Sequence, residues 1–267
     1  KGGDSNRAAI VQNTSGGMNT NVMTNGYLQL YNLTFNDKLN INDGSVLFLN
    51  EVNFESLNLD TDDYSQINVY GNSNAIIRDS NITGELRASE NSNINIEKSI
   101  LSSSSNSKYS LVAKKNSHID SEELTLSGEI NVNRGSSWSD DNSVINADSI
   151  YISQKGSFEI SDSTINCIGS YSCVNLKSSH LEMDGTTING TLRISNNSST
   201  SLWNTTVNGD SNDRTIKVTH NSNIQIDGTS SIIGHEGVNN TIWLWNNSSA
   251  DISGASTITA PTGVVAL

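Results

Sequence analysis

Carboxylates are the first residues to test for chemistry. Hydrolysis of a glycosidic bond needs two carboxyl groups that face each other across one groove. Asp140 and Asp141 are adjacent in sequence, so strand alternation would turn them to opposite faces unless they lie in a turn. We expect them in the turn after the second strand of a coil, at the slot that Asp79, Asp162 and Asn204 also hold. Separated surface carboxylates are favoured there over a stacked Ca²⁺ site, so neither a metal nor a cofactor is predicted.

Short fragments of the chain resemble the motifs of polygalacturonases, but they occur in the wrong order. Those enzymes carry Asn-Thr-Asp, Asp-Asp, Gly-His-Gly and Arg-Ile-Lys in succession. The nearest fragments here are Asp62-Asp63 or Asp140-Asp141, Gly234-His235-Glu236 and Arg214-Thr-Ile-Lys217. Since the Arg-Lys fragment precedes the His fragment, we interpret all of them as chance matches. No nucleophile with a base, phosphate-binding loop or nucleotide motif is present, so no catalytic residue is predicted.

The two cysteines predict a disulfide. They occur as Cys167-Ile-Gly-Ser-Tyr-Ser-Cys173, a spacing that closes a small loop. A disulfide implies an oxidising compartment. A metal site would need further ligands, and a redox-active pair would favour Cys-x-x-Cys spacing.

Tryptophans are the strongest indication of a binding surface. Within Ile242-Trp-Leu-Trp245 the aliphatic residues take the core positions, so Trp243 and Trp245 should point outward on one face. Trp203 follows the core residue Leu202 and should also point outward, whereas Trp138 takes a core position. Exposed Trp rings stack on sugars and anchor protein interfaces. A contiguous patch of Trp203, Trp243 and Trp245 is therefore the binding hypothesis, against rings that merely lie over a long loop.

Composition and charge limit the possible partners. Of 267 residues, 39 are Asn and 44 are Ser, which would suit a disordered chain. Ile, Val and Leu nevertheless alternate strictly with polar residues, which predicts ordered strands. The net charge is −13 and the Lys and Arg residues are scattered along the sequence, so nucleic acid and anionic membranes are not expected partners. No apolar stretch approaches the roughly 20 residues of a membrane span.

A repeat of about twenty residues organises the chain. One unit is Leu86-Arg-Ala-Ser-Glu-Asn-Ser-Asn-Ile-Asn-Ile-Glu-Lys-Ser-Ile100, and another begins at Ile216. Each unit predicts a short strand, a turn, a second strand and a third apolar pair, with extra residues inserted only after the third strand. The expected fold is all-β, a right-handed parallel β-helix with three sheets and about ten coils.

The repeat also suggests domain boundaries and a turn motif. Residues 1–38 fit poorly and are predicted to be an N-terminal cap or irregular first coils, while residues 39–267 form the β-helix; the register between 39 and 86 stays open. Asn-Ser pairs such as Asn91-Ser92 and Asn197-Ser198 recur at one turn. They predict a ladder of stacked Asn amides, and Asn also tolerates left-handed φ.

Asn- and Ser-rich β-helical coils, the closely spaced cysteine pair and a single proline, Pro261, resemble the passenger domain of Gram-negative autotransporter adhesins of the AIDA type. They are also similar to filamentous-haemagglutinin-like exoproteins. The resemblance covers residues from about 39 to 260 and lies in repeat style. It implies a secreted protein at the bacterial cell surface, associated with the outer membrane, with a role in adhesion, aggregation, biofilm formation and virulence. The translocator barrel of those families is absent, which would make the chain a passenger fragment.

Three functions are compatible with this sequence. The favoured one is a non-enzymatic cell-surface adhesin module that binds a host extracellular matrix protein or glycan, or that self-associates. The first alternative is a polysaccharide lyase or hydrolase of the pectin-lyase-like or tailspike type, and the second is a structural stalk. An enzyme predicts carboxylates with Arg or Lys in one groove, an adhesin predicts an extended aromatic or polar face, and a stalk predicts neither.

Overall fold

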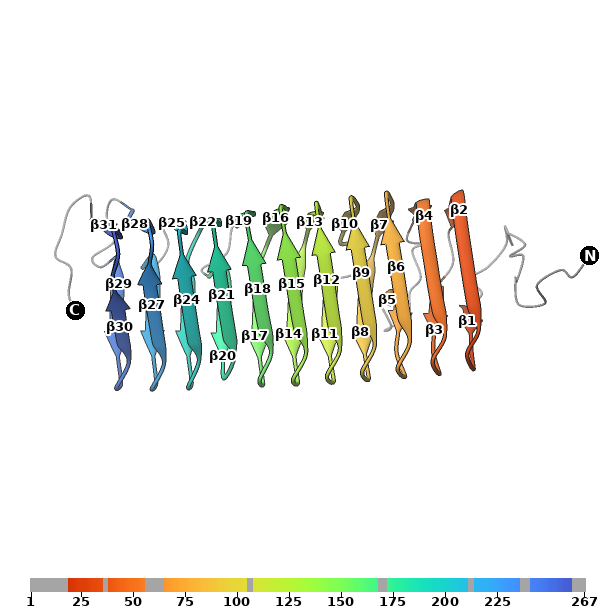
Figure 1. The fold of residues 1–267 in the computed structure, drawn as a ribbon, viewed down its shortest axis with the longest axis horizontal. Coiled ribbons are helices and arrows are strands. Elements are labelled where there is room, and N and C mark those ends of the chain that lie inside the picture. Colours follow the sequence, from red (N-terminus) through yellow and green to blue (C-terminus); the bar gives the residue numbers. More distant parts are fainter. Residues whose placement is uncertain are drawn as a thin grey trace, which may run out of the picture.

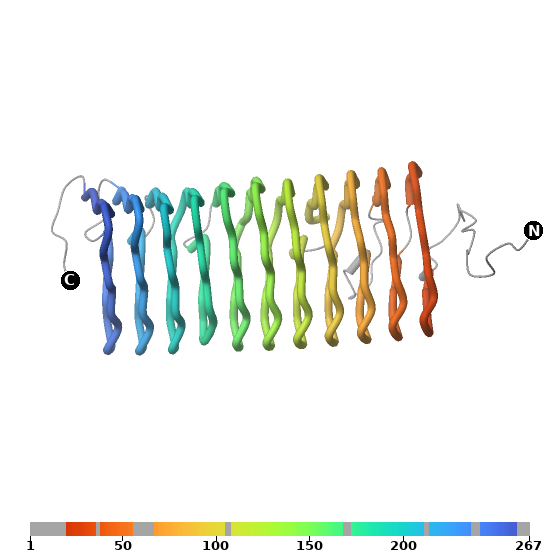
Figure 2. Tube along the Cα trace, viewed as in Figure 1, coloured from red at the N-terminus to blue at the C-terminus, as the bar shows by residue number. Residues whose placement is uncertain are grey.

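The protein is a rod of stacked coils. The computed structural model describes residues 19–35, 38–55, 65–104, 108–167, 172–210, 214–235 and 241–260. Consecutive coils lie side by side along the long axis, with the first described coil, which begins at Asn19, and the last, which ends at Thr259, at opposite ends of the rod (Figures 1 and 2). Every strand pairing in the described residues is parallel, and none of these residues forms a helix long and apolar enough to cross a membrane. The predicted all-β parallel solenoid is confirmed.

Each coil contributes one strand to an eleven-stranded sheet, here called sheet A. Its strands are β1 (Asn19–Val22), β3 (Lys38–Ile41), β5 (Ser65–Val69), β8 (Glu85–Ser89), β11 (Tyr109–Lys114), β14 (Glu129–Asn133), β17 (Ile150–Ser153), β20 (Val174–Lys177), β23 (Leu192–Ser195), β26 (Ile216–Thr219) and β29 (Ile242–Trp245).

The other strands form a twenty-stranded sheet with two rows, here called row B and row C. Row B contains β6 (Asn74–Arg78), β9 (Asn93–Glu97), β12 (His118–Glu122), β15 (Ser137–Asp141), β18 (Ser157–Ser161), β21 (His180–Asp184), β24 (Ser199–Trp203), β27 (Asn223–Asp227) and β30 (Ser249–Ile252). Row C contains β7 (Asn81–Thr83), β10 (Ile100–Ser102), β13 (Thr125–Ser127), β16 (Val144–Ala147), β19 (Thr164–Cys167), β22 (Thr187–Asn189), β25 (Thr206–Asn208), β28 (Ser231–Ile233) and β31 (Thr257–Thr259). The long strands β2 (Tyr27–Phe35) and β4 (Val46–Phe54) run through both rows.

The core consists of columns of aliphatic side chains that run along the axis. In sheet A, Ile130, Ile150 and Val174 stand in register on neighbouring strands and are fully buried. Strand alternation produces this arrangement, because every second side chain points inward. Each buried Ile or Leu contributes roughly 1.5–3 kcal/mol relative to an exposed one. Trp138 takes a core position as expected, and its ring stacks on Phe158 with centroids 4.3 Å apart.

The turn between sheet A and row B contains the recurrent Asn-Ser pairs. Asn91 and Asn197 have φ of 63° and 62°, so Asn supplies the left-handed backbone conformation, as expected. The predicted amide ladder is much weaker: among the described turn residues, only Asn91 donates to the preceding Asn72, over 3.4 Å. The hydroxyl of the buried serine joins adjacent coils instead. Ser198 Oγ donates to Ser195 O over 2.6 Å and accepts from the backbone N–H of Ser179 over 3.2 Å.

Buried hydroxyls recur at the turn between rows B and C, and Asn amides stack in row C. The backbone N–H of Ser143 donates to Ser163 Oγ over 2.9 Å at that turn. Along row C, Asn166 donates to Asn146 over 3.0 Å, and Asn189 donates to Asn166 over 2.7 Å. The Asn ladder that the sequence suggested therefore exists on an outer face of row C rather than at the Asn-Ser turn.

The stack begins before the boundary that the repeat suggested at residue 38. β1 pairs in register with β3, and β2 pairs with β4, so residues 19–35 belong to the stack. The apolar residues that reveal this are Leu28 and Leu30, which are buried. The open register is also resolved: Leu39 pairs with Ile67, and Ile67 pairs with Leu86. Residues 1–18 lie outside the described residues.

Replacing Ser198 by Ala tests the hydroxyl stacking. The change leaves the N–H of Ser179 without its acceptor in a buried turn, and an unsatisfied buried polar group costs about 1–3 kcal/mol. We expect a lower midpoint of urea unfolding, followed by circular dichroism. Ser201→Ala, at an outward position of β24, is the matched control and should change the midpoint little. Equal midpoints for the two variants would contradict the role assigned to the buried hydroxyl.

Candidate functional site

The predicted disulfide is present. Cys167, at the end of β19, is bonded to Cys173, which directly precedes β20, with 5.4 Å between their Cα atoms. Cys173 is fully buried against the core. The bond therefore joins row C of one coil to sheet A of the next. Its role is structural, since it closes the connection between two coils and exposes no reactive thiol.

Asp140 and Asp141 both lie in strand β15, which corrects the expectation that they occupy a turn. Asn142 takes the left-handed turn slot, with φ of 54°. Alternation then points Asp140 inward and Asp141 outward, so the two carboxylates do not face each other across a groove.

Asp140 is a carboxyl group inside the core. It is 2% exposed and accepts hydrogen bonds from Ser143 Oγ over 2.9 Å and from Ser163 Oγ over 3.2 Å. Ser121 Oγ also donates to it and in turn accepts from Trp138 Nε1 over 2.8 Å. Burial raises the pKa of Asp140 to about 6, although the three serine hydroxyls oppose that rise.

This buried carboxyl predicts a pH dependence of stability. A folded-state pKa near 6 lies above the unfolded value, so the folded state binds the proton more tightly. The contribution of Asp140 to stability is then fully present below about pH 4, and about 3 kcal/mol of it is lost as the pH rises through 6. We expect Asp140→Asn to flatten the dependence of the urea midpoint on pH between 4 and 7.5.

The neighbouring Asp141 provides the control for that measurement. Asp141 is exposed, and its charge is the smallest of the causes that raise the pKa of Asp140, so Asp141→Asn should retain most of the pH dependence of the unsubstituted chain. Parallel pH profiles for the unsubstituted chain and Asp140→Asn would show that the buried carboxyl is not their source.

The structure brings two of the three predicted tryptophans together. Trp243 and Trp245 lie on the outer face of β29, with ring centroids 5.8 Å apart and planes 9° from parallel. Trp203 ends β24 in row B and is 46% exposed. It therefore lies on a different sheet from the other two, and the patch as the sequence suggested it is divided between two faces.

Cations that the sequence reasoning did not include complete the aromatic pair. The Arg214 guanidinium carbon lies 4.3 Å from the Trp243 ring centroid, and Lys217 Nζ lies 4.7 Å from it. His220 meets Trp245 edge to face at 5.3 Å. Alignment of the repeat units beginning at Ile216 and Ile242 indicates that Lys217 lies beside Trp243, and the two are paired residues on adjacent strands. We call Arg214, Lys217, His220, Trp243 and Trp245 the aromatic–cationic cluster.

This cluster can bind an anionic, ring-shaped ligand. Trp245 is 51% exposed, so part of its ring is open to stacking. Arg and Lys side chains bind carboxylate and sulfate groups by charge-assisted hydrogen bonds. A sugar ring that carries an acidic group presents both features at once, whereas a purely apolar ligand would use only the rings.

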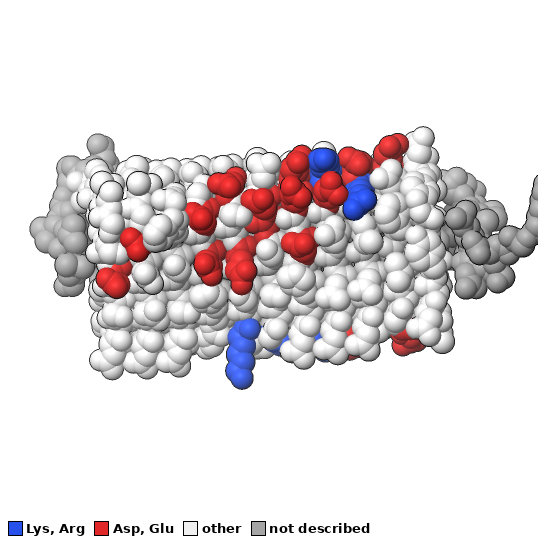
Figure 3. Space-filling view, in the orientation of Figure 1, with Lys and Arg blue, Asp and Glu red and all other residues white. Residues whose placement is uncertain are grey.

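Row B presents a second candidate, an acidic outer face that Figure 3 shows along the rod. Glu97, Glu122 and Asp141 take one register position on three neighbouring strands. With Asp120 and Arg78 they line a depression of about 260 Å³. We call this depression the acidic groove.

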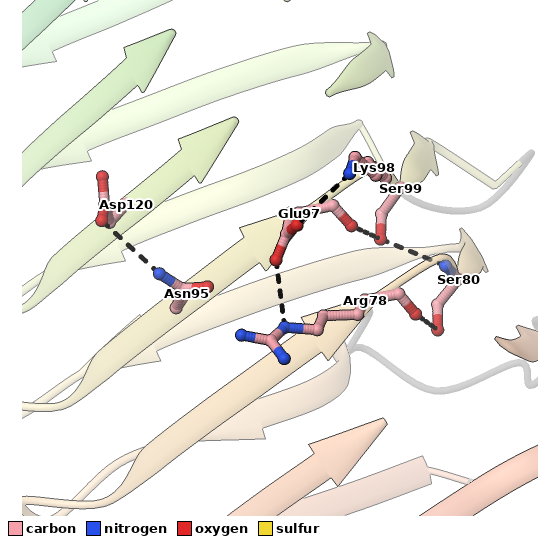
Figure 4. Close-up of polar contacts among 7 residues, drawn as sticks. All are labelled: Arg78, Ser80, Asn95, Glu97, Lys98, Ser99 and Asp120. Carbon is pink, nitrogen blue, oxygen red and sulfur yellow. Dashed lines mark hydrogen bonds and ion pairs between the residues drawn. The ribbon is translucent and has the colours of Figure 1, made fainter. Parts of the chain in front are cut away.

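Contacts between the side chains of the acidic groove restrain two of its carboxylates. Arg78 Nε lies 3.0 Å from Glu97 Oε2, and Lys98 Nζ lies 3.6 Å from the other oxygen of Glu97 (Figure 4). Asn95 donates weakly to Asp120, over 3.5 Å. Across the described residues, no three His, Cys, Asp or Glu side chains are placed to hold a metal ion.

Among the described residues, the Asp-Asp and Arg-Lys fragments that resemble polygalacturonase motifs lie on different sheets. Asp140 is inside row B, whereas Lys217 lies on the outer face of sheet A. Asp62, Asp63 and Glu236 lie outside the described residues.

Comparison with known proteins provides no family for this chain. No known family, no curated protein and no solved structure matches it.

Proposed function

We propose that this chain is a non-enzymatic binding module of a secreted bacterial cell-surface adhesin, and that it recognises a glycan through the aromatic–cationic cluster. In this proposal the rod is a right-handed β-helix with three sheets, because crossovers between parallel strands are almost always right-handed. The coils serve as a rigid support that holds the binding side chains at fixed spacing outside the cell.

The observation that carries the proposal is the pairing of exposed aromatic rings with cations on one outer face. Trp243 and Trp245 stack on each other, and Arg214 and Lys217 lie over the Trp243 ring. A stalk has no need for such a cluster, because an exposed aromatic surface invites unwanted association. Lys217, Trp243 and Trp245 also lie on strands, which hold side chains more firmly than loops do. A glycan is favoured over an apolar protein surface because the rings stand among charged groups.

Binding should depend on Trp245 and not on Trp203. Trp245→Ala removes the more exposed ring of the cluster, so we expect a loss in affinity of about tenfold or more, which corresponds to about 1.4 kcal/mol. The measurement is a glycan array with a panel of host matrix proteins, followed by calorimetry on the strongest hit. Trp203→Ala is the matched control, since it truncates a similarly exposed Trp on another sheet and should leave binding unchanged.

Two results of that screen would reject the proposal. Binding that is unchanged in Trp245→Ala would exclude the cluster as the site. Absence of binding to every glycan and matrix protein would favour the stalk.

The acidic groove supports one alternative, a polysaccharide-active enzyme. It gathers Glu97, Asp120, Glu122 and Asp141 near Arg78, and two carboxylates with a cation are the groups such an enzyme needs. Glu97 forms ion pairs with both Arg78 and Lys98, which argues against a catalytic role for the groove because one of its carboxylates is already paired.

Incubation of the chain with acidic polysaccharides distinguishes the enzyme from the adhesin. We expect no change in polymer length by size-exclusion chromatography. Cleavage that is lost in Glu122→Gln but retained in Glu159→Gln, an exposed carboxylate outside the groove, would establish the enzyme instead.

A further inference from the structure

Lysine and arginine residues that are scattered in the sequence gather on one face of the rod. Sheet A or the turn that follows it carries a cation in each of seven consecutive coils. These cations, here called the basic band, are Arg87, Lys114, Arg134, Lys155, Lys177, Arg193 and Lys217. The next strand of the sheet is β29, with Trp243 and Trp245, so the band leads directly to the aromatic–cationic cluster.

The cations lie on neighbouring coils, and register places two of them side by side. Arg193 and Lys217 are paired residues on adjacent strands, whose backbones lie about 4.8 Å apart. Lys217 is in turn paired with Trp243. Arg134, Lys155 and Lys177 are exposed at or beside the turn. The band spans six steps from β8 to β26, which is about 29 Å at this strand spacing.

Acidic residues on sheet A offset the band only at its β8 end. In the described strands of sheet A from β8 to β29, Asp and Glu occur only at Glu85 and Glu129, and the turn after β8 adds Glu90. Glu85 is 2% exposed and pairs with Arg87, Glu90 pairs with Lys115, and Glu129 pairs with Lys108 at 2.9 Å. From β17 to β29, the described strands of sheet A contain no Asp or Glu at all.

The charge of row B is the opposite. Its described strands from β9 to β30 contain no Lys or Arg, and their outward carboxylates include Glu159 and Glu182. The net charge of −13 is therefore divided unevenly between a positively charged face on sheet A and a negatively charged face on row B. A polyanion can bind the positive face although the protein as a whole is negatively charged.

We propose that sheet A binds a linear acidic polysaccharide along the rod axis, with its charged groups on the basic band and one sugar ring at the aromatic–cationic cluster. This inference rests on the proposed function and names the ligand class. Asn131, Asn175 and Ser195, outward residues between the cations, offer amide and hydroxyl groups to sugar hydroxyls. The electrostatic contacts supply affinity along the chain, and the cluster favours a sugar over a simple polyanion.

A single-stranded nucleic acid fits this face less well. Proteins that bind such strands place aromatic rings along the track so that successive bases stack on them. In the described strands from β14 to β26, Tyr151 is the one aromatic residue of sheet A. Each coil of the band therefore carries a cation, but the described strands lack the regularly spaced aromatic rings on which successive bases would stack.

The test uses polygalacturonate fractions of graded length, with neutral dextran and single-stranded DNA as comparison ligands, and measures Kd by calorimetry at several NaCl concentrations. We expect affinity for polygalacturonate to rise with length until the polymer spans the band, and to fall steeply with salt. Lys155→Gln with Lys177→Gln should weaken binding of long fractions about tenfold and leave short fractions unaffected. Trp245→Ala should weaken binding of short and long fractions alike.

Arg78→Gln with Lys98→Gln is the matched control. This control also removes two positive charges, and one residue of each double variant is a lysine with positive φ. Arg78 and Lys98, however, lie by the acidic groove and not on sheet A. The control should leave polygalacturonate binding unchanged. Equal losses in the two double variants would show an effect of net charge alone and would overturn the basic band.

The remaining outcomes separate the two proposals. Binding that needs Trp245 but shows neither length dependence nor sensitivity to Lys155 and Lys177 would overturn the basic band and retain the proposed function. DNA binding as tight as polygalacturonate at every salt concentration would overturn the choice of a polysaccharide. Binding of no polygalacturonate fraction would overturn the band, and the glycan array would then decide the proposed function independently.

Discussion

The structure depends on parallel backbone pairing between coils, which works only if every coil places its corners at the same height and position. A hydrogen bond in such a sheet joins one coil to the next, so a coil with a misplaced corner would lose the pairing of every strand that follows. Two features hold the corners in place. Residues with left-handed φ, such as Asn91 and Asn197, make the sharp turn, and a buried serine bonds to the amide of the adjacent coil. The abundance of Asn and Ser follows from this constraint.

Asp140 is where the chain departs from its own pattern. The strands on either side place Ser121 and Ile160 at the same inward position, so a carboxyl here is the least favourable member of its column. Burial of a charge is costly unless hydrogen bonds compensate, and the three serine hydroxyls at Asp140 provide that compensation only in part. The raised pKa of Asp140 is the outcome of this balance. The network is enclosed by protein, which argues for a local effect on stability rather than for a binding role.

The same regular scaffold explains how two opposite charge fields coexist on one small rod. Outward positions contribute little to the core, so their identity is free to vary from coil to coil without disturbing the pairing. A cation repeated on sheet A or a carboxylate repeated on row B then adds to a continuous face. Lys217 and Trp243 illustrate the principle: 26 residues of sequence separate them, yet they are neighbours in the sheet. Binding surfaces on a solenoid are built in this way, one outward residue per coil.

Much of the fold was determined by local patterns in the sequence. The alternation of Ile, Val and Leu, the roughly twenty-residue period and the close spacing of Cys167 and Cys173 are visible without any structure, because strand periodicity and short loops are local properties. The inward placement of Trp138 followed from the same alternation. The pattern is ambiguous where the number of residues at a turn or in a strand varies. Asp140 and Asp141 end a strand, and the turn that the sequence predicts for them begins one residue later. The long strands β2 and β4 hide the short repeat near the start of the chain, where the sequence predicts a cap or irregular first coils.

Only the tertiary structure decided which outward residues share a face. Trp203 and Trp245 look equivalent in sequence, since each follows an inward aliphatic residue at the end of a strand, yet one strand belongs to row B and the other to sheet A. Lys and Arg look scattered in sequence and form a band once the coils are stacked in register. The physical reason is that alternation fixes whether a side chain points in or out, whereas its neighbours along the rod depend on the insertions between coils, which change the sequence spacing from 18 to 28 residues without changing the strand register.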